Sequence, residues 1–161
     1  MIEINNLAKG YSLGRVDKKV FSTVAKKVLK GENREIPTLS RTHEKIGAEI
    51  SLAFVDKEEI KNLNKKFRKK NKPTDVLSFL LNDPPSHKAT EGQRKDYLGE
   101  IIICPEIVKE NAKKYGVSVK GELLKVFVHG ILHLCGYDHE KSEKEAEEME
   151  KIQEKYLTKI K

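Results

Sequence analysis

Apolar residues recur along the chain with two different periods, and segments of the two kinds alternate. In residues 17–30 the apolar side chains stand three or four positions apart, a spacing that places them on one face of a helix. Between Ala48 and Phe54 apolar residues occupy every second position, which predicts a strand. Residues 1–4 are consistent with another short strand. The first third of the chain therefore predicts the order strand, helix, strand.

The middle of the chain predicts a capped helix followed by a short strand. Asp56 and Glu59 have the spacing of a capping box, and the helix they begin carries its apolar residues on one face. Pro73 cannot continue a helix, so we expect this helix to end there. Residues 75–80 then predict a short strand, and the polar residues 82–96, with two adjacent prolines, predict a loop.

The last part of the chain predicts one buried strand and three helices. Residues 98–104 include three consecutive isoleucines, which favours a strand buried on both faces. Pro105 suits the first turn of a helix to about residue 115, and Ser118 suits the cap of a long helix to about residue 135. A final helix begins near Ser142. It carries four residues on its inward face: Ala146, Met149, Ile152 and Tyr156.

These elements predict an α/β fold in a single domain over residues 1–161. We expect one mixed sheet of about four strands, covered by helices. The long helix that ends near residue 135 should lie against the sheet. The sequence shows no internal repeat that would indicate a second unit.

The charge of the chain favours an anionic partner. The formal net charge is +7, and a basic run lies at the end of the predicted second helix. Nucleic acid is the commonest partner of such a protein, although a lysine-coated surface without a polyanion partner is the alternative. The two cysteines, Cys104 and Cys135, are expected to be buried and not to form a disulfide framework. Without a leader-like N-terminus or a membrane-length apolar run, we expect a cytoplasmic protein.

One eleven-residue segment has the spacing of a metal site. His129 and His133 are four positions apart, so both imidazoles project from one face of a helix. Gly136 can end that helix and turn the chain, which would carry His139 to the same point. Three imidazoles and an open fourth position are typical of a catalytic zinc site. The other two histidines, His43 and His87, lie in polar segments and are expected in solvated loops.

The histidine spacing equals that of the metzincin metalloproteases, with one difference. Those enzymes place a general-base glutamate directly after the first histidine, where this chain has Gly130. Glycine cannot accept a proton from water. The sequence therefore predicts hydrolytic zinc chemistry with the base located elsewhere, or direct use of a metal-bound hydroxide.

Two segments together resemble the YbeY endoribonuclease family. Residues 129–139 match the family pattern H-G-x-L-H-L-x-G-Y-D-H, and the segment beginning at Arg68 matches R-x-x-[KDN]-x-P-T-D-V-L-S-F. A third segment, Leu98-Gly-Glu-Ile, is similar to the family's L-G-D-I, with glutamate in place of aspartate. The resemblance spans about residues 50–150, and the N-terminal third carries no matching pattern.

The resemblance implies a metal-dependent endoribonuclease that acts on single-stranded RNA. It further implies a role in 3′-end maturation of small-subunit (16S) ribosomal RNA and in ribosome quality control, with ribosomal RNA and the small subunit as partners. Zinc is the implied metal, with His129, His133 and His139 as its ligands. Arg68 becomes the basic residue of the active-site cleft.

Several neighbouring residues are candidates for supporting roles. Arg68 can hold a phosphate, and three lysines beside it would contact the RNA backbone: Lys69, Lys70 and Lys72. Asp138 could orient a histidine or move a proton, or it could simply be a turn residue. Three further residues could line the cleft or form an ordinary turn: Thr74, Asp75 and Ser78.

Two other functions stay open at this point. The ligand spacing also suits a zinc hydrolase of peptide or amide bonds, although Gly130 and the basic charge argue against it. A non-catalytic ribosome-assembly factor with a structural metal is the third possibility, although an open coordination position argues against that role.

Overall fold

A mixed four-stranded sheet organises the chain. The computed structural model describes residues 2–32, except 7–17, together with 49–80, 97–139 and 141–159. The strands are β1 (Ile2–Asn6), β2 (Glu49–Phe54), β3 (Val76–Leu80) and β4 (Tyr97–Ile103). They lie in the order β1-β2-β4-β3. β1, β2 and β4 are parallel, whereas β3 runs antiparallel to β4 at the edge.

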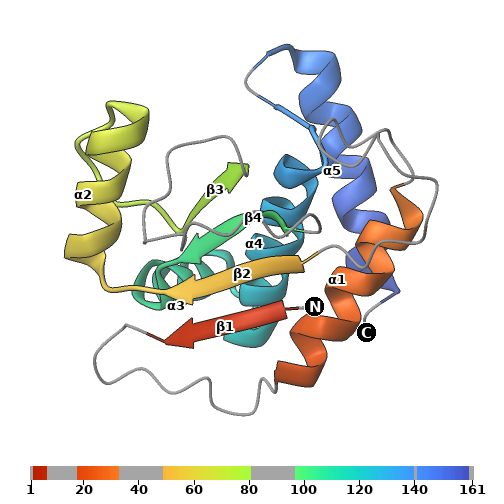
Figure 1. Cartoon of the computed structure of the whole chain (residues 1–161), viewed down its shortest axis with the longest axis horizontal. Helices are drawn as coiled ribbons and strands as arrows, with labels where there is room; N and C mark the ends of the chain where they lie inside the picture. The colour runs from red at the N-terminus through yellow and green to blue at the C-terminus, as the bar shows by residue number, and fades with distance from the viewer. Residues whose placement is uncertain (1, 7–17, 33–48, 81–96, 140, 160–161) are drawn as a thin grey trace.

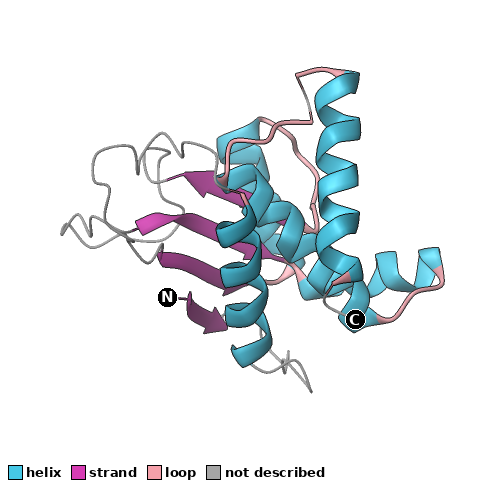
Figure 2. Ribbon diagram, turned by 90° about the vertical axis from the view of Figure 1, so that its right-hand side faces the viewer, coloured by secondary structure: helices cyan, strands magenta, loops and turns pink. Residues whose placement is uncertain are grey.

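Five helices accompany the described strands. Their bounds are α1 (Lys18–Gly31), α2 (Lys57–Arg68), α3 (Pro105–Tyr115), α4 (Val119–Leu134) and α5 (Glu143–Thr158). α4 is central, because it contacts α1, α3 and α5 as well as β3 and β4. Figure 1 shows α4 crossing the sheet with α1 and α5 beside it, and Figure 2 shows the strands as one layer next to the helices. The predicted α/β fold with a mixed sheet is confirmed.

The sheet is buried on both faces, as the three consecutive isoleucines of β4 predicted. Ile101 and Ile103 pack in the core that α1, α4 and α5 share with the sheet. Ile102 packs on the opposite face, with residues of α2. All three isoleucines are fully buried. The histidine-bearing helix is therefore fixed against a rigid surface.

Three helices begin at a side-chain cap, and the sequence predicted two of these caps, Asp56 and Ser118. Asp56, Ser118 and Ser142 each accept a hydrogen bond from the backbone N–H three residues ahead. Each bond satisfies an amide that has no partner within the helix. Both cysteines are buried and unpaired, and Met149 lies in the core, as expected.

The predicted end of α2 at Pro73 is wrong. The helix ends at Arg68, because Lys69 adopts a left-handed conformation with φ 59° and donates its backbone N–H to the Asn64 carbonyl. The Asn64 side-chain amide then bonds the Lys72 carbonyl at 2.7 Å. Residues 69–72, which include three lysines, therefore form a turn that leads the chain from α2 toward β3.

Some predictions fall outside the part of the chain that the structure describes. These concern His43, His87 and the proposed loop over residues 82–96. Among the described helices, none has the length and apolar character needed to cross a membrane.

Candidate metal centre and its cleft

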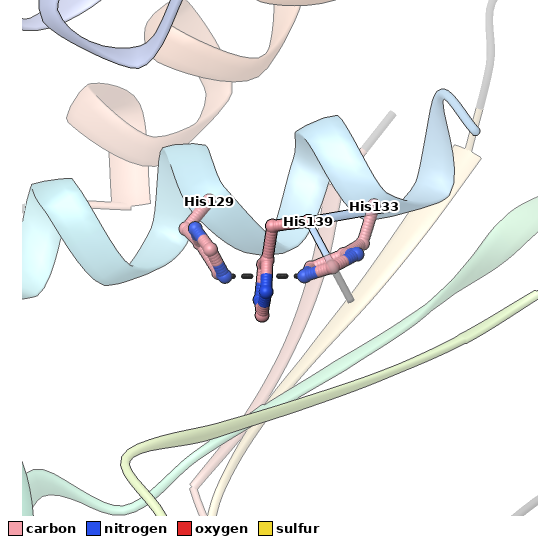
Figure 3. Close-up of side chains that lie close together, drawn as sticks. All are labelled: His129, His133 and His139. Carbon is pink, nitrogen blue, oxygen red and sulfur yellow. Dashed lines mark hydrogen bonds between the residues drawn. The ribbon is translucent and has the colours of Figure 1, made fainter. Parts of the chain in front are cut away.

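The structure brings the three predicted histidines together. One ring nitrogen from each of His129, His133 and His139 lies within 4.8 Å of the others. Two of the side chains project from α4 and the third from the turn that follows it, and Figure 3 shows the three rings converging beside the helix. Among the described residues, these three histidines form the one group of side chains that could together hold a metal ion.

Hydrogen bonds fix the orientation of two of the rings. His129 Nδ1 lies 3.0 Å from Gln153 Oε1, and His133 Nδ1 lies 2.9 Å from the Tyr137 carbonyl oxygen. Both partners are acceptors, so both Nδ1 atoms donate. The neutral rings then present Nε2 lone pairs toward each other, with the Nε2 atoms 3.1 Å apart. Facing lone pairs are the arrangement that a shared cation stabilises, so these residues fit a metal ion.

The surroundings favour the neutral form of both rings. Burial, together with the neighbouring His133, lowers the pKa of His129 to about 4. Burial also lowers the pKa of His133, with His139 adding to the effect. Only neutral imidazole can donate its lone pair to a metal. Two of the three side chains are therefore in the ligand form at neutral pH.

The turn after α4 depends on a glycine, as the sequence predicted. Gly136 has φ 90°, a value that side chains with a Cβ rarely adopt. Its N–H bonds the His133 carbonyl, and the Tyr137 N–H bonds the Leu132 carbonyl. This reversal directs His139 back toward the helix.

Gly130 allows α4 to approach the sheet closely. A Cβ atom at this position would lie 3.0 Å from Ile101 Cγ2 and 3.2 Å from Ser78 Oγ. A Cβ here would be in tight contact, so these neighbours would have to move by a few tenths of an ångström. The close packing of α4 against β3 and β4 therefore disfavours the protease-type glutamate at this position.

A cleft of about 500 Å³ joins the histidines to the basic turn after α2. Arg68, Lys70 and Lys72 line it together with all three histidines. The Arg68 Nη2 atom donates to the Ser78 carbonyl at 3.0 Å, and its guanidinium lies 5.9 Å from the centre of the Phe79 ring. These contacts hold the cationic guanidinium in the lining of the same cleft that the histidines line.

The other predicted site residues divide into two groups. Four of them line the cleft: Thr74, Asp75, Ser78 and Asp138. Lys69 does not line it, because its ammonium is directed back to the Lys66 carbonyl, 3.4 Å away. Asp138 also lies 3.9 Å from the Lys141 ammonium. Tyr137 is buried, and its hydroxyl donates to Glu32.

Sequence reasoning missed the two groups that orient the histidines. Gln153 occupies the inward face of α5 between Met149 and Tyr156, and a buried polar residue among apolar ones was the signal that could have revealed it. The Tyr137 carbonyl gives no such signal in the sequence, because every residue has a backbone carbonyl group. Its role follows only from the path of the turn.

Comparison with known proteins identifies the family. The model of the family described as endoribonuclease YbeY matches residues 6–161. The chain belongs to this family. A curated endoribonuclease YbeY from Thermotoga petrophila is 43% identical over 111 residues, which cover 69% of this chain and 67% of the relative. Another, from Sulfurihydrogenibium sp., is 39% identical over 146 residues, which cover 90% of each protein.

A solved structure shows that the likeness extends to the fold. The solution structure of a Thermotoga maritima protein aligns with 99% of this chain and 89% of its own, at 34% identity and a TM-score of 0.54. The resemblance drawn from the two sequence patterns is thus confirmed, and it reaches into the N-terminal third. The chain is a member of a family of hydrolytic nucleases.

Proposed function

We propose that this YbeY-family member is a zinc-dependent endoribonuclease that cleaves single-stranded RNA. The observation that carries the proposal is the single cleft that the three clustered histidines and Arg68 line together. A zinc ion held by His129, His133 and His139 would supply a water activated near neutral pH and polarise a phosphoryl oxygen.

The residues of the chain position the scissile phosphate. The Arg68 guanidinium has five N–H donors, of which the Ser78 carbonyl engages one, so others can donate to phosphate oxygens. Such charge-assisted bonds strengthen as negative charge develops in the transition state. Lys70 and Lys72, which line the same cleft, would contact further phosphates of the RNA backbone. Asp138, which also lines the cleft, would accept or relay a proton.

The biological substrate that we propose is ribosomal RNA. We infer that the enzyme acts in 3′-end maturation of 16S ribosomal RNA and in ribosome quality control, in the cytoplasm, with the small subunit as a partner. Family membership supports this assignment. The basic cleft is also suited to an extended, single-stranded polyanion.

The alternatives gain no support from the site. A peptide hydrolase of the metzincin type would need its glutamate at position 130, where the chain has a glycine packed closely against Ile101. Membership of an enzyme family argues against a purely structural assembly factor.

Cleavage of a labelled single-stranded fragment of 16S ribosomal RNA tests the proposal. We expect cleavage by the zinc-loaded protein, loss of cleavage after chelation and recovery when zinc is restored. His133→Ala should be inactive at every zinc concentration. Cleavage that persists in both the chelated protein and the His133→Ala variant would refute the metal-dependent mechanism.

A further inference from the structure

A second pocket adjoins the histidine cluster, and Arg68 does not line it. Its volume is about 410 Å³, within the range of small-ligand sites. His129 and His139 line both this pocket and the basic cleft, so the two cavities meet at the candidate metal centre. An RNA strand that places a phosphate at the histidines would bring a neighbouring nucleotide to this second pocket.

A buried carboxylate lines the pocket without a partner. Glu122, in the first turn of α4, is only 4% exposed. Among the residues that the structure describes, no hydrogen bond or ion pair is found for its carboxylate, whose oxygens keep some contact with solvent. A carboxylate on a largely buried side chain favours partners that donate hydrogen bonds, because few water molecules can reach it. Glu122 is therefore suited to a ligand with N–H donors.

An exposed aromatic ring lies at the same pocket. Tyr115 ends α3 and is 57% exposed. The Lys114 and Lys125 ammonium groups lie over this ring, 5.3 and 5.6 Å from its centre, so a base that stacks here takes the place of a flexible lysine side chain. An exposed ring flanked by cations is the usual platform on which proteins stack an unpaired nucleobase.

We propose that this pocket binds one unpaired guanine base of the RNA substrate, next to the nucleotide linkage held at the histidines. Tyr115 stacks on the base, and the Glu122 carboxylate accepts from its ring N–H and its exocyclic amino group. Guanine is the base whose Watson–Crick edge presents two adjacent donors, and one carboxylate can accept both. The inference rests on the proposed function, because it assumes RNA as the substrate.

Binding of short RNAs to the zinc-loaded full chain tests the inference. The probes are uridine pentamers with phosphorothioate linkages, in which a single guanosine or inosine occupies each position in turn. Inosine lacks only the amino group. At one position we expect guanosine to bind about tenfold more tightly than inosine, as a hydrogen bond to a buried charge would give. Equal affinity of guanosine, inosine and uridine at every position would overturn the inference.

Two pairs of variants separate the roles of the residues. Glu122→Gln should abolish the preference for guanosine over inosine, whereas Glu147→Gln, at an exposed position of α5, should retain it. Tyr115→Ala should weaken all pentamers alike, and Tyr115→Phe should bind as the unchanged protein does. Retention of the guanosine preference in Glu122→Gln would contradict the assignment of that carboxylate.

The outcome is separable from that of the proposed function. If the chain binds guanosine selectively but does not cleave unmodified RNA, the pocket assignment stands and the nuclease proposal fails. If it cleaves RNA with no base preference in binding or cleavage, the nuclease proposal stands and the pocket assignment fails.

Discussion

At the scale of single residues, the site depends on acceptors that orient the metal-binding rings. His129 can present Nε2 only while a group accepts the Nδ1 proton, and Gln153 Oε1 provides that acceptor at 3.0 Å. Gln153 is itself 8% exposed and anchored on α5. The affinity for zinc should therefore depend on a residue that does not touch the metal.

Replacing Gln153 with methionine should weaken zinc binding about ten- to a hundredfold, as loss of such an orienting partner typically does. Methionine has a similar shape but no strong acceptor, so the packing of α5 is retained. Competition with a fluorescent zinc chelator measures the change. Gln153→Glu keeps an acceptor and should keep the affinity. Equal affinities in the unchanged protein and Gln153→Met would show that His129 needs no orienting partner.

At the scale of secondary structure, one buried carboxylate joins three elements. Glu32 directly follows α1 and is 7% exposed. It accepts from the Tyr137 hydroxyl in the metal-binding turn and from the Tyr156 hydroxyl of α5, the latter at 2.6 Å. Gly31 makes room for this contact, because a Cβ there would lie 2.0 Å from Tyr156 Oη. These bonds fix the turn that carries His139.

Glu32→Ala should lower the free energy of unfolding by about 2–4 kcal/mol, because it leaves two buried tyrosine hydroxyls without their acceptor. Denaturant unfolding measures the loss. Glu154→Ala, at an exposed position of α5, should change stability by less than about 0.5 kcal/mol. A loss no larger in Glu32→Ala than in this control would contradict the role of the carboxylate.

The elements were largely predictable from the sequence, but contacts between them were not. Caps such as Ser118 and the buried run of β4 are local signals, so the helices and strands could be placed within a few residues. The end of α2 was misplaced because a left-handed lysine gives no local signal. Glu32 and Gln153 escaped detection because their partners are distant in sequence, at Tyr156 and His129.

At the scale of the whole molecule, the chain has a net charge of +7, and the fold brings some of its basic residues into the cleft of the histidines. The end of α2 and the end of α4 are brought together by β3, which lies at the sheet edge and contacts both helices. The sequence predicted both the basic run and the histidines. Only the structure shows which members of the run, Lys70 and Lys72, line the cleft and that Lys69 does not.

Single-stranded RNA binding should weaken with salt, with a slope set by the lysines of the cleft. Lys70→Ala and Lys72→Ala should each reduce the slope of log affinity against log salt by about 0.7, the value for one phosphate contact on a single strand. Lys69→Ala should leave the slope unchanged. Fluorescence anisotropy at several salt concentrations measures these slopes. Equal slopes in all three variants would indicate that the RNA follows another path.

The central claim is that Arg68 and the three histidines act on the same phosphate. The most direct test compares Arg68→Ala with Lys69→Ala in single-turnover cleavage of single-stranded RNA, at equal zinc occupancy and saturating protein. Removing a group that stabilises transition-state charge should slow Arg68→Ala about a hundred- to a thousandfold. Lys69→Ala should cleave at nearly the unchanged rate, because its side chain does not line the cleft. Comparable rates in the two variants would contradict the account.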